Sequence, residues 1–437
     1  MIVCFPELCK HSQGLTQKTF RQMIGVCYND CSSFMTGGSV NKEKDVAGVT
    51  DLELVRSLFP EMVKRRRHLH RNPEVSYKEE KTSAYVATIL TQLGIEVRTG
   101  VGGYGIVAVI RGKLPGKTVA LRADMDALPI QDEKLCDYAS EIPGVMHACG
   151  HDGHTATLLA VGEYFSRRLD TLQGEIRLIF QPAEEVCPGG ATAMIRDGAI
   201  EGADVIYGVH LWTPIPVGTA ASAPGPLMAS TDEFFVDMKG QGGHGGMPHA
   251  AIDSVVAGAA LVMQLQTIVS RSVDPLDPAV VTIGSIQGGT VQNVIAEHCV
   301  LSGTVRCFKE ETRHLIRRRI EEMAEGTAKA YGAEAVIDYV MGYPPLVNHD
   351  AEVNRFFREA GNAFGLRAEV SPKIMPAEDF AYYVQQIPGC FVLVGAGNPA
   401  KGASYPHHHP KFDLDEESML YAAGLLITLA ESYLGEN

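Results

Sequence analysis

Short β-rich runs alternate with helical stretches along most of this chain, and that alternation restricts the fold more than any other feature. In residues 105–212 the helical patterns HTATLLAVGEYFSRRL and GGATAMIRDG lie between the runs GIVAVIRG, TVALRADMDALP, EIRLIFQPAEE and ADVIYGVHLW. Strands that alternate with helices form mostly parallel sheets with helices packed on their faces. We therefore predict an α/β fold, preceded by two helices that end at Asn72-Pro73 and at Gly94.

The rhythm changes near residue 229, where a β-α-β-β-α-β order begins. That order is typical of a ferredoxin-like α+β module of about 110 residues. The first pattern then resumes with a helical stretch at 351–364 and the run CFVLVGAG. We predict an α/β domain of residues 49–228 and 343–437, interrupted by an inserted domain of residues 229–342. Residues 1–48 lack periodicity, and we expect a poorly ordered extension.

Charge and apolar patterning narrow the class of protein. The net charge is −14 and the pI is near 5.5, which argues against a nucleic-acid partner. The sequence contains no run of 18 apolar residues, so we expect no membrane span. The N-terminus lacks the basic segment of a secretory signal. Four of the ten cysteines lie in the first 31 residues without the tight Cys-x-x-Cys spacing of a metal motif, and the other six are scattered without the spacing of a disulfide framework. We therefore expect a reduced, cytoplasmic protein that acts on small molecules.

Polar side chains gather where the predicted strands end. In open α/β sheets, ligands bind beyond the carboxyl ends of the strands. A carboxylate at the end of an apolar strand is costly unless a cation compensates it, and a pair of divalent metals is the simplest compensation. The residues at these ends are Asp124, Asp126, Cys149, His151, Asp152, His154, Glu184, Glu185, His210, His407, His408 and His409.

The spacing of these residues fits a metal site, although a lone histidine such as His210 is more often structural. Cys149 and His151 lie two residues apart, so both can point to one side of an extended loop. Glu184 and Glu185 would point in opposite directions on a strand, so one could bind metal while the other holds a proton. Thiolate, imidazole and carboxylate together suit zinc, manganese, cobalt or nickel.

These strings resemble a known family. RADMDALPI, MHACGHDGHT, FQPAEE, GVHLW, GGHGGMPH and HHHPKFD are similar, in order, to motifs of the aminoacylase/carboxypeptidase-like metallopeptidases. The similarity is greatest to the amidohydrolase branch, which contains hippurate hydrolases, N-acyl-amino-acid hydrolases and indole-acetyl-amino-acid hydrolases. It extends from about residue 52 to the C-terminus. The resemblance implies a two-metal hydrolase with an inserted dimerisation or lid domain.

The resemblance also implies roles for individual residues. Glu184 would be the general base and acid, and Cys149 would bridge two divalent ions (Mn²⁺, Zn²⁺, Co²⁺ or Ni²⁺). Relatives carry His-x-Asp where this chain has Asp124-Met-Asp126, so His151 would replace the missing histidine and Asp126 would orient a ligand. The expected metal ligands are Cys149, His151, Glu185, His210 and His408.

Two points in this assignment stay open. Counting back from PKFD places the ligand at His408, but His407 and His409 remain alternatives. His154, on the first turn of a helix, is expected to support the site rather than to bind metal.

Other motifs of the resemblance concern the substrate. His244, in GQGGHGGMPH, would reach the active site of a partner subunit and stabilise the oxyanion. Asn293, Arg306 and Glu378 occupy positions on the substrate side, and Asp379 is an alternative to Glu378 at the pocket. A homodimer or higher homo-oligomer formed through the inserted domain is therefore expected.

The expected reaction is metal-dependent hydrolysis of N-acetyl, N-benzoyl or aryl-acetyl amino acids to a carboxylate and a free amino acid. A metallo-carboxypeptidase or dipeptidase is the second hypothesis, ranked lower because such relatives more often keep the His-x-Asp pair. A non-catalytic metal-binding protein is the third, and it is disfavoured because Glu184 and the expected ligands are all present.

Overall fold

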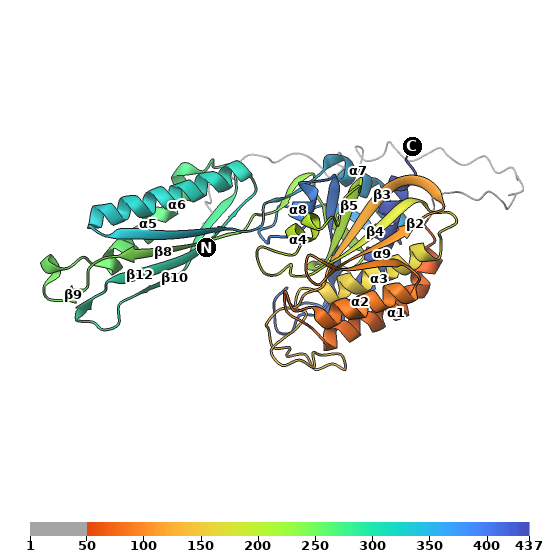
Figure 1. Ribbon diagram of the computed structural model, residues 1–437, viewed down its shortest axis with the longest axis horizontal. Helices are drawn as coiled ribbons and strands as arrows, with labels where there is room; N and C mark the ends of the chain where they lie inside the picture. The colour runs from red at the N-terminus through yellow and green to blue at the C-terminus, as the bar shows by residue number, and fades with distance from the viewer. Residues whose placement is uncertain (1–49, 437) are drawn as a thin grey trace, which may run out of the picture. The chain divides into compact units, whose positions relative to one another are not determined.

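The computed structural model describes residues 50–436, which contain two large sheets (Figure 1). The extension predicted for residues 1–48 lies outside the described residues. The larger sheet has eight strands in the order β1-β2-β4-β3-β5-β16-β6-β15. Its strands are β1 Glu96–Val101, β2 Gly105–Arg111, β3 Leu114–Asp124, β4 Gln173–Gln181, β5 Val205–Pro216, β6 Thr219–Ser222, β15 Arg367–Val370 and β16 Gly389–Gly397.

This sheet is mixed, whereas the sequence predicted mostly parallel strands. The centre agrees with the prediction, because β3 pairs in parallel with β4 and β5, and β5 with β16. The pairs β1–β2, β2–β4 and β16–β6 are antiparallel. Short turns cause the difference, because three residues join β1 to β2 and two join β5 to β6, too few for a parallel crossover.

Helices cover both faces of the larger sheet, because alternate strand residues point to opposite sides. On β2, Ile106 and Ala108 pack in the core beneath α1, α2, α3 and α9, whereas Val107 packs in the core that contains α4 and α8. The helices are α1 Leu52–Arg71, α2 Glu80–Gln92, α3 His151–Ser166, α4 Ala191–Arg196, α7 Asp350–Glu359, α8 Ala381–Val384 and α9 Glu417–Leu434. The predicted α/β class is confirmed.

The smaller sheet is antiparallel, with the order β10-β12-β8-β13, and α5 and α6 lie along one face (Figure 1). This order is that of a ferredoxin-like module, as the sequence predicted. Its apolar core contains only residues between Phe234 and Tyr339. The elements are β8 Asp232–Lys239, α5 Ser254–Thr267, β10 Ala279–Gly288, β12 His298–Cys307, α6 Glu310–Tyr331 and β13 Glu334–Met341.

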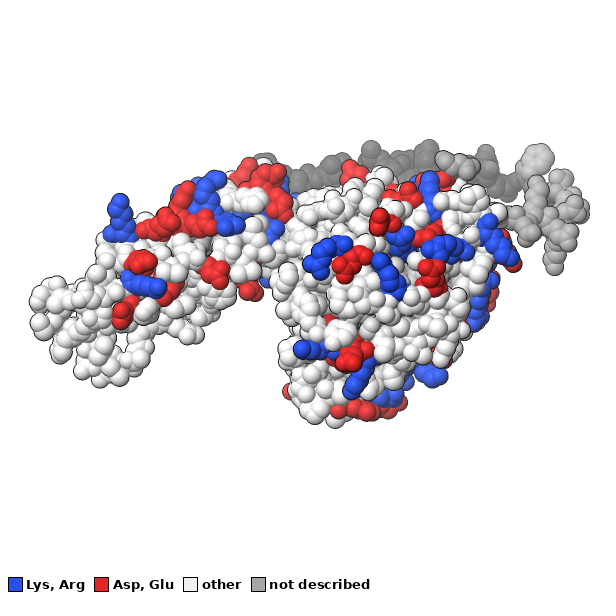
Figure 2. Space-filling model, viewed as in Figure 1, with Lys and Arg blue, Asp and Glu red and all other residues white. Residues whose placement is uncertain are grey.

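Two short ladders complete the described strands: β7 Gly225–Met228 with β14 Leu346–Asn348, and β9 Gly243–His244 with β11 Val294–Ile295. Acidic and basic side chains are interspersed on the face that Figure 2 shows, including the part over α6. Basic side chains of α6 form ion pairs with glutamates of the same helix, as in Arg317–Glu321 and Arg319–Glu322. These side chains therefore form an ion-paired surface and not a separate cationic patch.

One stretch, Ser254–Ser272, is long and apolar enough to cross a membrane by length and composition. In the structure its helix α5 buries Ala257, Leu261 and Leu265 against the smaller sheet. The opposite side of α5 exposes Val256 and Met263, whose exposed fractions are 49% and 71%. This helix therefore presents an apolar face with no neighbour among the described residues.

Candidate metal centre and active site

The central strands bring the predicted residues to one edge of the larger sheet. β3 ends at Asp124, β4 ends three residues before Glu184, and His210 lies in β5. The loop that ends at Cys149 and the segment of His407 and His408 approach the same edge. Ligand atoms within 4.8 Å of one another occur in five groups among the described residues: Cys149, His210 and His407; Cys149, Glu185 and His408; His151, Glu184 and Glu185; Asp124, His151 and His154; and Glu184, Glu378 and Asp379.

His151 is buried and has one ring nitrogen free. Its Nδ1 lies 2.9 Å from the backbone oxygen of Asp126 and 3.2 Å from Oδ1 of the same residue. Its Nε2 has no hydrogen-bond partner and lies 3.8 Å from Oε1 of Glu185, a buried oxygen that also lies 3.3 Å from Nε2 of His408. At 3.8 Å the two atoms form no hydrogen bond with each other, and a bound cation would satisfy both. This arrangement fits a metal ion.

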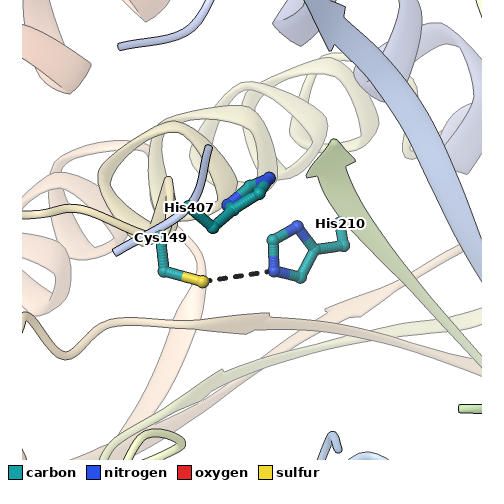
Figure 3. A group of neighbouring side chains, drawn as sticks. All are labelled: Cys149, His210 and His407. Carbon is teal, nitrogen blue, oxygen red and sulfur yellow. Dashed lines mark hydrogen bonds between the residues drawn. The ribbon is translucent and has the colours of Figure 1, made fainter. Parts of the chain in front are cut away.

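Cys149 and His210 form the second part of the site. Figure 3 shows Sγ of Cys149 pointing toward the ring of His210, and the distance to Nε2 is 3.4 Å. The Nδ1 of His210 lies 3.1 Å from the backbone oxygen of Leu211 and donates to it. That contact assigns the proton to Nδ1, so Nε2 can act as a ligand.

The electrostatics also favour a cation. Burial, followed by the negative charges of Glu185 and Glu184, raises the pKa of the Cys149 thiol well above its usual value. Burial, followed by Glu378 and Glu185, likewise raises the pKa of Glu184. A divalent ion would oppose both effects, because its charge stabilises thiolate and carboxylate alike.

The argument that Glu184 and Glu185 point in opposite directions was wrong. They do not belong to the strand, because β4 ends at Gln181 and Ala183 has a left-handed backbone with φ 54°. This turn places both carboxylates in one group with His151. The extended loop expected around Cys149 is also absent, since Gly150 is left-handed with φ 97° and His151 begins α3.

The three consecutive histidines have different surroundings. His409 is turned away, because its Nδ1 accepts from the Lys411 backbone N–H and its ring stacks on Tyr405. His408, which has a left-handed backbone, places Nε2 at 3.3 Å from Oε1 of Glu185. His407 lies beside Cys149 and His210, as Figure 3 shows.

His407 also has a supporting contact. Its Nε2 accepts from the backbone N–H of Thr213 at 3.3 Å, and its ring stacks on Trp212 at 4.4 Å between centroids. One ring nitrogen of His407 is thus engaged and its ring is fixed, while its Nδ1 is buried without a hydrogen-bond partner. Of the three consecutive histidines, His407 and His408 therefore remain candidates for the metal ligand, and His408 faces Glu185.

His154 supports the site from beneath. Its Nδ1 lies 2.6 Å from Oδ1 of Asp124, and its Nε2 accepts from the backbone N–H of Leu211 at 2.9 Å. Both ring nitrogens are engaged, so His154 is not free to bind metal. The other oxygen of Asp124 accepts from Arg122 at 2.6 Å. The negative charge of the Asp124 carboxylate is thus compensated by His154 and Arg122 without a metal.

Sequence reasoning missed Arg122. This guanidinium is fully buried and joins Asp124 to two residues far along the chain, with Glu378 at 3.0 Å and Asp379 at 2.8 Å. Its position two residues before Asp124 in a strand was the available signal, because both side chains point to the same face. Asp379 also accepts from Gln181 and from a backbone N–H, so it is structural.

A cavity of about 680 Å³ opens onto these groups. Arg306 is half-buried in its wall, and within the described residues no carboxylate forms an ion pair with it. Tyr343, also missed from the sequence, donates to the backbone oxygen of Glu184 at 2.6 Å. The lining residues are Cys149, Glu184, Glu185, Val186, Cys187, His210, Trp212, Met228, Thr231, Glu233, Arg306, Tyr343, Pro376, Ala377, Glu378, His407 and His408.

Two predicted residues do not line this cavity. His244 is exposed on β9, and its Nδ1 accepts from the backbone N–H of Gly246. Asn293 is next to it, because its backbone oxygen accepts from the N–H of Gly245 at 2.7 Å. The described chain therefore keeps His244 and Asn293 together but apart from its own cavity.

Comparison with known proteins places this arrangement in a family. A family model described as Peptidase family M20/M25/M40 matches residues 120–432. The N-acyl-L-amino acid amidohydrolase of Geobacillus stearothermophilus is 44% identical over 68% of this chain and 80% of its own length. Thermostable carboxypeptidase 2 of Saccharolobus solfataricus is 38% identical over 84% of this chain and 94% of its own length.

A solved structure agrees. The Bacillus subtilis YXEP protein, described as a dinuclear metal-binding peptidase of family M20, is 34% identical and covers 87% of this chain and 99% of its own, with a TM-score of 0.76. The predicted family and fold are confirmed by these matches. The chain therefore belongs to Peptidase family M20/M25/M40, in its amidohydrolase branch, and is a hydrolase of amide bonds.

Proposed function

We propose that this protein hydrolyses the amide bond of N-acyl amino acids and releases a carboxylate and a free amino acid. The observation that carries the proposal is the convergence of Glu184 and Glu185 at the wall of one cavity, with Nε2 of the buried His151 at 4.0 and 3.8 Å from their carboxylate oxygens. The amidohydrolase relative supports the substrate class. The absence of a His-x-Asp pair at Asp124-Met-Asp126 favours this class over the peptidases.

We infer that this site would hold two divalent metal ions through Cys149, His151, Glu185, His210 and His408. The dinuclear relative and the donor set support two metals. When bound, such ions supply Lewis-acid polarisation of the acyl carbonyl and lower the pKa of the attacking water. Thiolate, imidazole and carboxylate donors favour Mn²⁺, Zn²⁺, Co²⁺ or Ni²⁺ over Ca²⁺ or Mg²⁺.

Glu184 is the proposed general base and acid. Its carboxylate accepts a proton from the attacking water, and the same proton then goes to the nitrogen of the leaving amine as the C–N bond breaks. Tyr343 holds the backbone oxygen of Glu184, so the side chain keeps its direction during both transfers. Burial raises the pKa of Glu184, which suits a group that must release a proton again.

Arg306 is the proposed partner for the free carboxylate of the substrate. It lies in the cavity wall, and its side-chain hydrogen bonds within residues 50–436 go to Thr304 and a backbone oxygen. A guanidinium without a carboxylate partner can form a charge-assisted pair with the ligand. Glu378, also in the cavity wall, would border the substrate pocket from the opposite segment.

We propose residues 229–342 as a lid domain through which two copies associate. The unpartnered apolar face of α5, with Val256 and Met263, supports such an interface. His244 and Asn293 would then complete the cavity of the partner subunit, where His244 stabilises the oxyanion and Asn293 binds substrate. The remaining segments, 49–228 and 343–437, form the proposed catalytic domain. We expect the protein in the cytoplasm.

The proposal is tested by primary-amine release from N-acetyl, N-benzoyl and indole-acetyl amino acids and from dipeptides. Chelated protein is assayed with and without added Mn²⁺ or Zn²⁺. We expect metal-dependent release from the acylated amino acids. Release from dipeptides alone would contradict the proposal and assign the protein to the peptidases, an activity that the carboxypeptidase relative makes the second candidate.

A further inference from the structure

The loop between α1 and α2 contacts Ala183 and Val186, the residues on either side of Glu184 and Glu185, although it contributes no residue to the cavity wall. We call residues 74–79 the α1–α2 loop. Its residue Tyr77 has φ 63°, and Ala183, next to Glu184, has φ 54°. The backbone N–H groups of these two left-handed residues both donate to the side chain of Glu79.

Glu79 is fully buried and accepts from both strained residues. Its Oε1 receives the backbone N–H of Tyr77 at 3.0 Å and the backbone N–H of Ala183 at 2.8 Å. A left-handed conformation costs free energy for any residue with a Cβ, so surrounding contacts must hold it. At Ala183 those contacts are the carboxylate of Glu79 and the Gly190 N–H, which donates to the Ala183 oxygen at 3.1 Å.

The rest of the α1–α2 loop contacts the residues on either side. The Tyr77 hydroxyl donates to the backbone oxygen of Val186 at 3.1 Å. The Ser76 hydroxyl donates to Oδ2 of Asp126 at 2.6 Å, and the same oxygen accepts the backbone N–H of Glu185 at 3.0 Å. The loop thus fixes both ends of the turn that carries the two glutamates.

We propose that Glu79 is a positioning residue that holds Ala183 in its left-handed conformation and so turns Glu184 and Glu185 toward the same site. Without this turn the two glutamates would continue the strand and point to opposite faces. Glu79 acts through the backbone and touches neither substrate nor metal. The inference rests on the proposed function, because it assigns the origin of the geometry that this function needs.

The test is a double-mutant cycle between Glu79 and Ala183. Glu79→Met keeps the length of the side chain but removes the acceptor, whereas Glu79→Gln keeps the acceptor. Ala183→Gly removes the cost of the left-handed turn, since glycine adopts positive φ freely. Glu80→Gln, on the exposed neighbouring residue, is the matched control. Each variant is assayed for kcat, KM, melting temperature and Mn²⁺ affinity.

Trp212 provides a readout that does not depend on turnover. It is the single tryptophan of the chain, and its ring lies 5.2 Å from the ring of His210. Its fluorescence can therefore report Mn²⁺ binding to each variant. Loss of a residue that orients metal ligands typically weakens metal binding by about 10–100-fold.

We expect E79M to lower kcat about 100-fold, with KM within about twofold, and to weaken Mn²⁺ binding about 10-fold. E79Q and E80Q should stay within about threefold of the wild type. In the A183G background the effect of E79M on kcat should shrink to about 10-fold, because glycine holds the turn without Glu79.

Three results would overturn the inference. The first is an E79M protein with full kcat and metal affinity, and the second is an effect of E79M that is equally large with and without A183G. The third concerns the case in which E79M does not fold. The double variant E79M/A183G should then fold, and its failure to fold would show that Glu79 does not act by supporting Ala183. Inactive wild-type protein with normal Mn²⁺ binding would instead contradict the proposed function, while the metal-affinity cycle would still test Glu79.

Discussion

Single backbone conformations decide which way the chemical groups of this site face. Ala183 turns two consecutive glutamates to one side, and Gly150 ends the cysteine loop so that α3 can begin at His151. The sequence predicted which residues gather, because their types and places at strand ends are visible. It did not predict their directions, because a left-handed alanine depends on partners such as Glu79 that lie about a hundred residues away.

The histidine cluster yields a prediction about metal content. His408→Ala should remove one of two metal ions per chain or weaken its binding by at least about 10-fold, because His408 faces Glu185. His409→Ala should leave metal content unchanged, since its side chain is turned away. Elemental analysis after dialysis measures both. Full metal content in H408A together with loss in His407→Ala would transfer the role to His407.

Glu79 yields a prediction about pH. Burial first, and the charge of Asp126 second, raise its pKa from 4.5 to about 7. The folded protein therefore keeps this proton to a higher pH than the unfolded chain, so the stability of the wild type falls as the pH rises through this window. E79Q lacks this loss. Its free energy of unfolding relative to the wild type should rise by on the order of 3 kcal/mol between pH 4.5 and 7.

Urea unfolding in the presence of a chelator measures this difference, since metal binding then makes no contribution. Above about pH 8 the difference should be constant, because Glu79 is then ionised in both states. A difference that does not change with pH across the whole range would show that the Glu79 carboxyl titrates normally.

At the scale of elements, a buried ion network joins α1 to the start of α3, where the proposed ligand His151 lies. Arg66, in the C-terminal half of α1, is fully buried and pairs with Asp152 at 2.8 Å and Asp413 at 2.7 Å. Asp152 follows the proposed ligand His151 directly, and His70 of α1 also contacts it at 2.7 Å. Arg66 belongs to the basic run of residues 64–67, and this run is therefore not a purely solvated helix face.

Replacing Arg66 tests this network. Arg66→Met would leave the buried carboxylate of Asp152 and the partly buried carboxylate of Asp413 without this cation, and we expect a loss of about 3–5 kcal/mol in the free energy of unfolding. Arg67→Met is the matched control, because Arg67 is partly exposed and its ion pair is with Glu416. That variant should lose less than about 1 kcal/mol. Equal losses in the two variants would contradict the buried network.

The elements themselves were largely predictable from sequence. Apolar periodicity and the Asn72-Pro73 boundary located α1, and the β-α-β-β-α-β order identified the smaller sheet. Short strands such as β6 and β15 were missed, since four residues carry too little periodicity. The mixed sheet was missed for a related reason, because strand direction depends on turn lengths that are hard to define before strand boundaries are known.

At the scale of the whole molecule, the account expects two copies to associate through α5. Met263→Glu places a charge in the centre of the apolar face, so it should convert a dimer to monomers. Leu135→Glu is the matched control, since Leu135 is fully exposed and lies outside residues 229–342. Sedimentation velocity distinguishes the two species. A monomeric wild-type protein would show that there is no such interface. An M263E protein that is still a dimer would show that the interface lies elsewhere.

The central claim is that Glu184 transfers the proton in metal-dependent hydrolysis of N-acyl amino acids. The most direct test compares turnover of an N-acetyl amino acid by wild-type and Glu184→Gln protein, each loaded with Mn²⁺ and checked for metal content. We predict a fall in kcat of about 10²–10⁴-fold with the metal content unchanged. Turnover by E184Q within a few-fold of the wild type, at equal metal content, would contradict the claim.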